Sequence, residues 1–166
     1  LEVTNNVPVH KGDVFFIESG TLHAIGKGIL IAEIQQNSNT TYRVYDYGRV
    51  GKDGKPRELH IEKAIDVTEL CPPKYDTKPQ GKPVKIDGGE ETLLRSCEYF
   101  DVHKIKVSGT VTLDADEKSF MSVLVLDGSG KIGELDAKKG DSFFVPAGYG
   151  RFTLTGNLEV ILSDIV

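Results

Sequence analysis

Two side chains in the first third of the chain have the chemistry of a metal or catalytic site. His23 follows a glycine turn, and a neutral imidazole held on a strand is a common zinc ligand. Arg43 lies twenty residues further on, and a fixed guanidinium can stabilise negative charge on an oxygen by donating hydrogen bonds. Taken alone, each has a simpler interpretation. A lone histidine is more often a core or surface residue, and Arg43 could be a structural arginine paired with Asp46 or Glu33.

Polar side chains alternate between these two residues and beyond them. Glu33, Gln35 and Asn37 are spaced two apart, so on a strand they share one face. If that face lines a pocket, Glu33 or Asp46 could orient a ligand or move a proton. The alternative is that this polar stretch simply closes one end of a β barrel.

An internal repeat indicates two related domains. The segment KGDVFFIESG at Lys11–Gly20 recurs as KGDSFFVPAG at Lys139–Gly148, with six of the ten positions identical. Gly and Asp suit the turn into a strand, and the closing Gly suits a tight turn after it. Aligning the copies places Arg151 opposite His23. Because a guanidinium cannot ligate a metal, the second copy is predicted to lack a metal site.

Strands are the elements that must position these residues. Short apolar runs separated by Gly, Asn and Asp are typical of a sandwich or barrel, and one stretch with helical spacing, Ile61–Val67, predicts a single short helix between the domains. The fold class is therefore all-β, with two related β domains of which the first is incomplete. The expected strands include Val14–Ile17, Ile29–Ile34, Val123–Leu126, Ser142–Val145 and Leu158–Leu162.

A proline-rich segment divides the chain. Four prolines fall within Cys71–Lys85, which has almost no large apolar side chains, as is typical of a linker. We expect residues 1–70 to belong to the first domain, residues 71–89 to form the linker and residues 90–166 to form the second domain. The sequence begins close to the expected end of a strand, which suggests a fragment of a longer protein.

Composition argues against several function classes. The 166 residues carry a net charge of -5 without a long block of either sign, so nucleic acid and membrane are poor candidate partners. No apolar stretch approaches the roughly 20 residues that span a bilayer, and no basic leader opens the chain, so we expect a cytoplasmic protein. Cys71 and Cys97 lack metal-site spacing and are read as reduced structural residues.

Two motifs carry a resemblance to a known family. The stretch from Gly12 to Gly26, which contains GTLHAIG, resembles the second conserved motif of the cupins. The segments EIQQNSNTTYRVYDYGR (33–49) and RELHI (57–61) closely resemble the type I mannose-6-phosphate isomerases, in particular the shorter bacterial members. The resemblance is dense from residue 9 to about 70 and looser beyond. It implies a cupin-like jelly roll and the C-terminal half of such an isomerase.

The same resemblance implies roles for single residues. His23 matches the last zinc ligand of the family and Arg43 its active-site arginine. The other family ligands lie on strands before Val9 and have no counterpart here. His10 and His60 do not fall at motif positions and are expected to be surface or structural residues. Zn²⁺ is thus the implied cofactor, with one ligand on this chain.

The resemblance also implies a substrate and a reaction. The expected function is the zinc-dependent interconversion of mannose 6-phosphate and fructose 6-phosphate through a cis-enediol. Glu33, Gln35 and Asp46 are candidate substrate contacts, and Arg49 and Arg57 could contact the phosphate. The alternative is a non-catalytic cupin-like protein that binds a sugar or sugar phosphate. We further expect the chain to associate with a missing N-terminal segment or with a second copy, because an incomplete barrel exposes strand edges.

Overall fold

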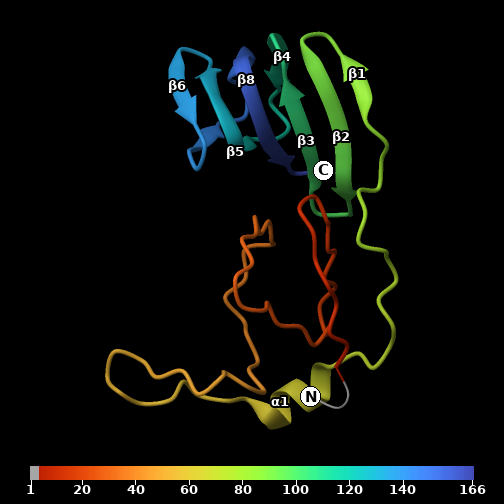
Figure 1. Cartoon of the computed structure of the whole chain (residues 1–166), viewed down its shortest axis with the longest axis vertical. Coiled ribbons are helices and arrows are strands. Elements are labelled where there is room, and N and C mark those ends of the chain that lie inside the picture. The colour runs from red at the N-terminus through yellow and green to blue at the C-terminus, as the bar shows by residue number, and fades with distance from the viewer. Residues whose placement is uncertain (1–3) are drawn as a thin grey trace. The chain divides into compact units, whose positions relative to one another are not determined.

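The computed structural model describes residues 4–166 as two compact units (Figure 1). One unit comprises residues 16–76, and the other combines the residues up to 15 with residues 77–166. We call them the first unit and the C-terminal unit and describe each by itself. No helix in the described part of the chain is long and apolar enough to cross a membrane.

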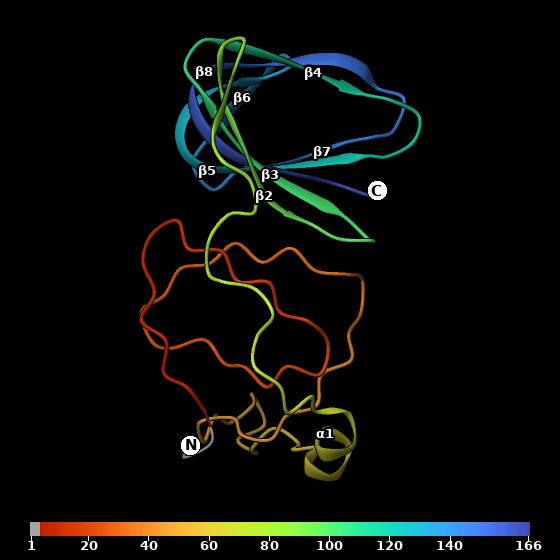
Figure 2. The ribbon, with the colours of Figure 1, turned by 90° about the vertical axis from the view of Figure 1, so that its right-hand side faces the viewer.

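The C-terminal unit is a rolled antiparallel β structure (Figures 1 and 2). All of its strand pairs are antiparallel. Its strands are β1 (Val84–Ile86), β2 (Gly89–Ser96), β3 (Asp101–Val107), β4 (Thr110–Ala115), β5 (Met121–Ile132), β6 (Leu135–Lys138), β7 (Ser142–Val145) and β8 (Gly150–Asp164).

Two long strands hold this unit together. β8 pairs with β5 over most of its length, with β4 through Gly150–Thr155 and with β3 through Leu158–Asp164. β5 pairs with β7 near its start and with β6 near its end. Each long strand therefore belongs to both faces of the roll, and the pairing path runs β1-β2-β3-β8-β5-β6.

Glycines allow the long strands to bend where the two faces meet. A Cβ added to Gly128 would lie 2.0 Å from the carbonyl oxygen of Asn157, so only glycine permits this approach. On β8, Gly156 has a φ of 108°, which other residues rarely adopt. A register shift between Val125 and Asp127 adds to the bend.

The core lies inside the roll. Its fully buried side chains are aliphatic and alternate along the strands, as in β8, where Leu158, Val160 and Leu162 point inward. Burying each such side chain contributes about 1.5–3 kcal/mol. The cluster comprises Ile105, Val107, Val111, Ala115, Val123, Val125, Ile132, Ala137, Val145, Phe152, Leu154, Leu158, Val160 and Leu162.

The predicted elements of the C-terminal unit are confirmed. Ser142–Val145 is β7, and the other two predicted runs lie within β5 and β8. The predicted helix Ile61–Val67 is also confirmed, as α1 of the first unit. It begins after His60 with Glu62 in its first turn, where a negative charge is favoured by the helix dipole.

The predicted strands at Val14–Ile17 and Ile29–Ile34 are wrong for this structure. Residues 16–60 form no helix or strand among the described residues, apart from one isolated bridge between Val50 and Pro56. The physical reason is that a strand is defined by its pairing, and these segments find no partner strand in the described chain. Their apolar side chains accordingly stay exposed, with Leu30 at 92%.

The two copies of the repeat make the same turn but differ in pairing. In the first copy the Asp13 N–H donates to the His10 carbonyl, and the Asp13 carboxylate accepts from the His10 N–H. Asp141 and Lys138 form the same two bonds in the second copy. Only the second copy then continues into a strand, β7, which pairs with β5. The turn is thus local, whereas the strand depends on a neighbour.

Charged side chains meet at one end of the roll. Asp101 on β3 lies directly opposite Asp164 on β8, and an oxygen of each carboxylate is shielded from solvent with no hydrogen-bond partner in the described chain. On the same face His103 Nδ1 lies 2.9 Å from a carboxylate oxygen of Glu91. Burial raises the pKa of Asp164, while His103 lowers it and Asp101 raises it.

Replacing Asp164 by Asn is expected to stabilise the C-terminal unit at neutral pH. A raised pKa means that the folded chain holds the proton more tightly. This stabilisation is complete below the ordinary aspartate pKa of about 3.9 and is lost as the pH rises through the raised value. The asparagine side chain carries no charge, so the variant does not lose this stability as the pH rises. Amide hydrogen exchange along β3 and β8 between pH 5 and 8 measures the effect.

The control for this prediction is Asp136→Asn, because Asp136 is 94% exposed and lies on β6. At each pH, the exchange rates along β3 and β8 in Asp136→Asn should equal those of wild type. Identical pH dependence in wild type and Asp164→Asn would contradict the prediction.

Candidate functional site

The geometry of His23 suits a metal ligand. Its ring Nδ1 lies 2.8 Å from the carbonyl oxygen of Thr21, and because a carbonyl only accepts, Nδ1 carries the proton. Nε2 is then left with its lone pair. Ligating histidines commonly use one ring N–H on a backbone carbonyl in this way. The side chain is exposed, so Nε2 is accessible.

One histidine does not make a zinc site. A catalytic zinc normally takes three protein ligands, and the described residues contain no group of three His, Cys, Asp or Glu side chains arranged to hold a metal ion. His10, 81% exposed, lies beside Asp13 and helps to form the turn of the repeat. Within the described part of the chain, His23 is thus a single candidate ligand and not a complete metal site.

Arg43 is bound to His60 through the backbone and the imidazole ring. The His60 N–H donates to the Arg43 carbonyl at 2.7 Å, and the Arg43 N–H donates to His60 Nδ1 at 3.2 Å. The His60 side chain is only 19% exposed, which agrees with a structural histidine. His60 falls at no motif position in the sequence, and spacing alone did not reveal its contact with Arg43.

An ion pair joins the same two segments at a second point, three residues after Arg43 and three residues before His60. The guanidinium of Arg57 donates to both carboxylate oxygens of Asp46, with Nε to Oδ2 at 2.6 Å. The hydrogen bonds from Arg57 hold the pKa of Asp46 below its usual value, with further lowering by the charges of Arg57, Arg49 and Arg43. Segments 43–46 and 57–60 thus run antiparallel and are bound at both ends.

A strained turn follows Asp46. Tyr47 has a φ of 55°, which is uncommon for a residue other than glycine, and Gly48 continues with a φ of 67°. The Arg49 N–H closes the turn on the Asp46 carbonyl at 3.0 Å. The Arg49 guanidinium lies 5.5 Å from the centre of the Tyr47 ring, within cation–π range. Residues with such strain are frequent at functional sites.

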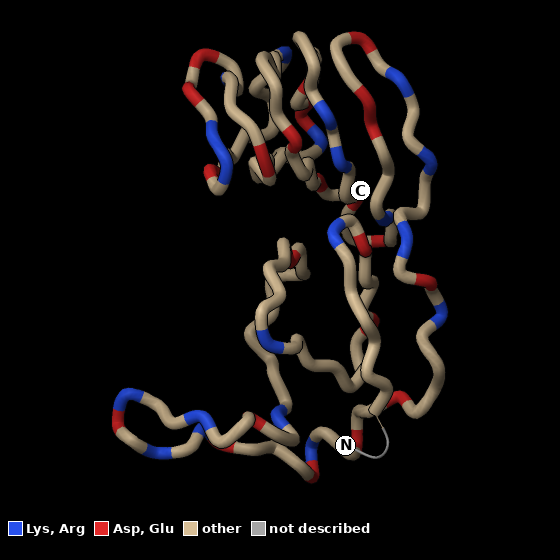
Figure 3. Tube along the Cα trace, viewed as in Figure 1, with Lys and Arg blue, Asp and Glu red and all other residues tan. Residues whose placement is uncertain are grey.

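The structure brings some predicted site residues together and leaves others apart. Arg43 and Asp46 lie on one segment, with Arg49 and Arg57 near the Asp46 carboxylate. Glu33 and Gln35 are exposed on an irregular segment, so their predicted shared strand face is not formed. Basic residues recur through 49–57, where Figure 3 shows blue segments along the loop.

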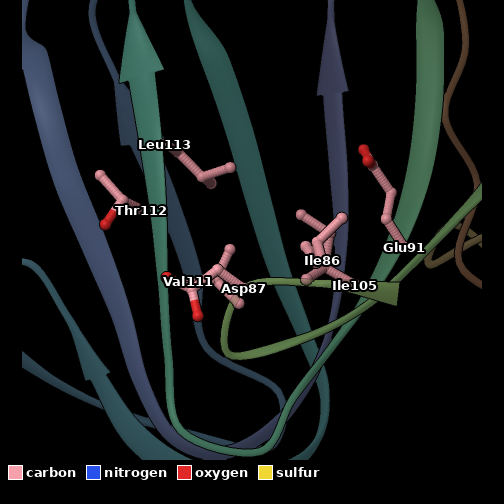
Figure 4. Close-up of a pocket in the computed structure, with 7 residues that line it drawn as sticks. All are labelled: Ile86, Asp87, Glu91, Ile105, Val111, Thr112 and Leu113. Carbon is pink, nitrogen blue, oxygen red and sulfur yellow. The ribbon is translucent and has the colours of Figure 1, made fainter. Parts of the chain in front are cut away.

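The C-terminal unit holds a cavity of about 250 Å³ at the side of its roll. Figure 4 shows Ile86 and Ile105 near its centre, Glu91 at one side and β4 residues on the other. Its wall is mainly aliphatic, and the carboxylate of Glu91 is already in contact with His103. Arg151, opposite His23 in the repeat, is 83% exposed on β8 and lies 3.9 Å from Asp114.

Comparison with known families and structures relates the chain to mannose-6-phosphate isomerases. The family model described as "Mannose-6-phosphate isomerase, cupin domain" matches residues 89–165. The mannose-6-phosphate isomerase ManA of Bacillus subtilis is 43% identical over 168 residues, which cover 99% of this chain and 52% of that protein. The Streptococcus mutans mannose-6-phosphate isomerase is 40% identical over 161 residues, covering 95% of this chain and 50% of that protein.

A solved structure shows the same similarity. The crystal structure of the mannose 6-phosphate isomerase from Bacillus subtilis matches with a TM-score of 0.65 and 36% identity, covering 77% of this chain and 41% of that one. The chain therefore spans about half the length of the curated relatives it matches. The cupin-like, all-β fold is confirmed.

Asp46→Asn is expected to loosen the pair of segments that carries Arg43. The lowered pKa of Asp46 means that its ion pair stabilises the fold above the ordinary aspartate range, and that this contribution is lost as the pH falls through the lowered value. In the variant, the asparagine side chain offers Arg57 a neutral acceptor in place of the charged carboxylate. Faster amide exchange at Arg43 and His60 at pH 7 measures the loss.

Asp66→Asn serves as the matched control, because Asp66 is an exposed carboxylate on α1 of the same unit. Equal exchange rates at Arg43 in both variants would show that the Asp46–Arg57 pair does not hold the segment.

Proposed function

The chain belongs to the mannose-6-phosphate isomerase family, and we propose that it is the C-terminal half of a zinc-dependent isomerase of mannose 6-phosphate and fructose 6-phosphate. The observation that carries the proposal is the 43% identity to the Bacillus subtilis enzyme over 99% of the chain. That alignment includes the segments of His23 and Arg43. The cytoplasmic location of the chain stays a prediction.

The reaction explains why these two residue types are needed. Interconverting an aldose phosphate and a ketose phosphate moves a proton between C1 and C2 through a cis-enediol, and negative charge develops on oxygen. Arg43 would donate hydrogen bonds to that oxygen, and its guanidinium keeps its charge at any working pH. A bound zinc ion would supply further polarisation of the oxygen.

His23 would hold zinc through Nε2. The Thr21 carbonyl supports this role because it takes the Nδ1 proton and orients the ring. We propose that the remaining ligands lie on the half of the relatives' length that this chain does not span, so the complete site forms when the chain joins a preceding N-terminal segment. A second copy is the alternative partner.

The pairing deficit of the first unit supports this association. The segment Val14–Ile17 follows the same turn as β7 does but has no strand beside it in the described chain, although the Val14 N–H donates to the Thr77 carbonyl. Ile17 and Leu22 of the first unit, and Phe15 just before it, are more than 40% exposed. A partner strand would satisfy the peptide groups and bury this apolar surface at about 25 cal/mol per Å².

The proposed substrate contacts lie around Arg43. Arg57 is already held by Asp46, which favours a structural role for that pair. Arg49 keeps its guanidinium over Tyr47 and is the better candidate for the phosphate. Glu33 and Gln35 remain candidates for the sugar hydroxyls, once a partner strand orders their segment.

A non-catalytic cupin-like protein that binds a sugar or sugar phosphate is the second candidate. The single histidine ligand favours it only if the complete protein lacks the other ligands. Zinc content and turnover of the complete protein therefore separate the two functions.

The deciding experiment measures zinc content and fructose-6-phosphate to mannose-6-phosphate isomerisation for this chain alone and with its N-terminal half added. We expect stoichiometric zinc and turnover only after the addition, because one imidazole binds zinc weakly. Zinc without turnover would favour the sugar-binding function. Equilibrium sedimentation of the chain alone should show association, and a well-behaved monomer would count against it.

Arg43→Ala in the complete protein is expected to lower kcat by about 100-fold or more, as the loss of an oxyanion-stabilising donor does elsewhere. Zinc content should stay normal because Arg43 is not a ligand. Arg151→Ala is the matched control, since Arg151 is exposed on the C-terminal unit. Unchanged turnover would remove Arg43 from the mechanism.

A further inference from the structure

His60 occupies the point where α1 meets the segment of Arg43. It is the N-cap residue of α1, and its carbonyl accepts the Ala64 N–H at 2.9 Å. Ala64 is the buried residue of the helix. An N-cap side chain often bonds the first turn of its own helix, but the His60 side chain makes no such bond. The ring instead accepts the Arg43 N–H.

Three contacts restrict the orientation of the ring. Nδ1 faces the Arg43 N–H at 3.2 Å, Nε2 lies 3.8 Å from a carboxylate oxygen of Glu58, and the ring centre lies 6.0 Å from that of Tyr42. Lys63 of α1 lies 6.0 Å from the Tyr42 ring on the same side of the unit. Glu58 is 84% exposed, so its pull on Nε2 is weak.

The bond to Arg43 exists in only one protonation state. Nδ1 can accept the Arg43 N–H only when it carries no proton, which places the hydrogen on Nε2. Protonation would set two donors, Nδ1–H and the Arg43 N–H, against each other. The carboxylate of Glu58 lies 3.8 Å from Nε2 of His60. Arg43 contributes its backbone N–H to the contact with His60, and Lys63 of α1 lies against Tyr42, which neighbours the His60 ring.

We propose that His60 is a positioning residue for Arg43, which holds the arginine's backbone through a neutral imidazole and releases it when the imidazole is protonated. This inference rests on the proposed function. With Asp46–Arg57 at the other end, the segment of Arg43 is fixed at two points three residues apart. A displacement of about 1 Å in a catalytic group can cost about 100-fold in rate, so removing one point reduces turnover.

The test compares variants of the complete protein. His60→Leu removes the acceptor, whereas His60→Asn keeps an oxygen close to the position of Nδ1 that does not protonate. We expect His60→Leu to lower kcat by about 10- to 100-fold with little change in KM or zinc content. His60→Asn should keep most of the activity, and we expect its kcat to decline less toward acid pH than that of wild type.

Two controls separate positioning from helix capping and from general damage. His60→Ser caps a helix well but is too short to reach the Arg43 N–H, so it should behave as His60→Leu does. His10→Leu changes an exposed histidine and should leave kcat and its pH profile unchanged. Full activity in His60→Leu, or equal rescue by Ser and Asn, would overturn the proposal.

A measurement that does not depend on enzyme activity distinguishes the positioning role of His60 from the proposed isomerase function. Amide exchange at Arg43 should be faster in His60→Leu and close to wild type in His60→Asn. If the complete wild-type protein does not isomerise sugar phosphates, the proposed function fails, while Arg43 exchange still decides whether His60 holds this segment. Equal exchange in all three proteins would overturn the positioning role.

Discussion

The pairing of extended segments decides which parts of this chain form a stable β structure. β8 serves three neighbours at once, β3, β4 and β5, and its bend lets one strand belong to both faces of the roll. The buried aliphatic cluster follows from that arrangement, because inward-facing residues of all these strands meet inside. In residues 16–60 the same kind of sequence lacks a partner strand in the described chain, and most of its large apolar side chains are exposed.

Several contacts in the first unit are polar and close to its surface, beside ring contacts such as that between Phe16 and Tyr75. Lys74 pairs with Glu18, Arg57 pairs with Asp46, and the Glu69 N–H donates to the Gly20 carbonyl. Surface ion pairs contribute about 0–1 kcal/mol each, which is less than one buried aliphatic side chain contributes. These contacts can therefore set the local geometry around Arg43 while contributing little to the stability of this unit.

The two copies of the repeat share a turn but differ in the residues that follow it. Both copies of the repeat keep the Asp-closed turn, yet the first copy presents His23 after it and the second presents Arg151. The interior around the C-terminal copy is filled by the aliphatic cluster, and one end of the roll carries Asp101, Asp164 and the Glu91–His103 pair. The same turn therefore precedes different side chains in two different settings.

Sequence patterns alone determined the features that depend on neighbours along the chain. The helix Ile61–Val67, the strand Ser142–Val145 and the repeated turn all follow from local spacing and turn residues. The motifs around His23 and Arg43 also indicated the family. Only the tertiary structure decided that Val14–Ile17 forms no strand in the described chain and that His60, read as a surface or structural residue, bonds to Arg43 across seventeen residues. Strand pairing and such contacts join residues distant in sequence, and no local pattern encodes which partners meet.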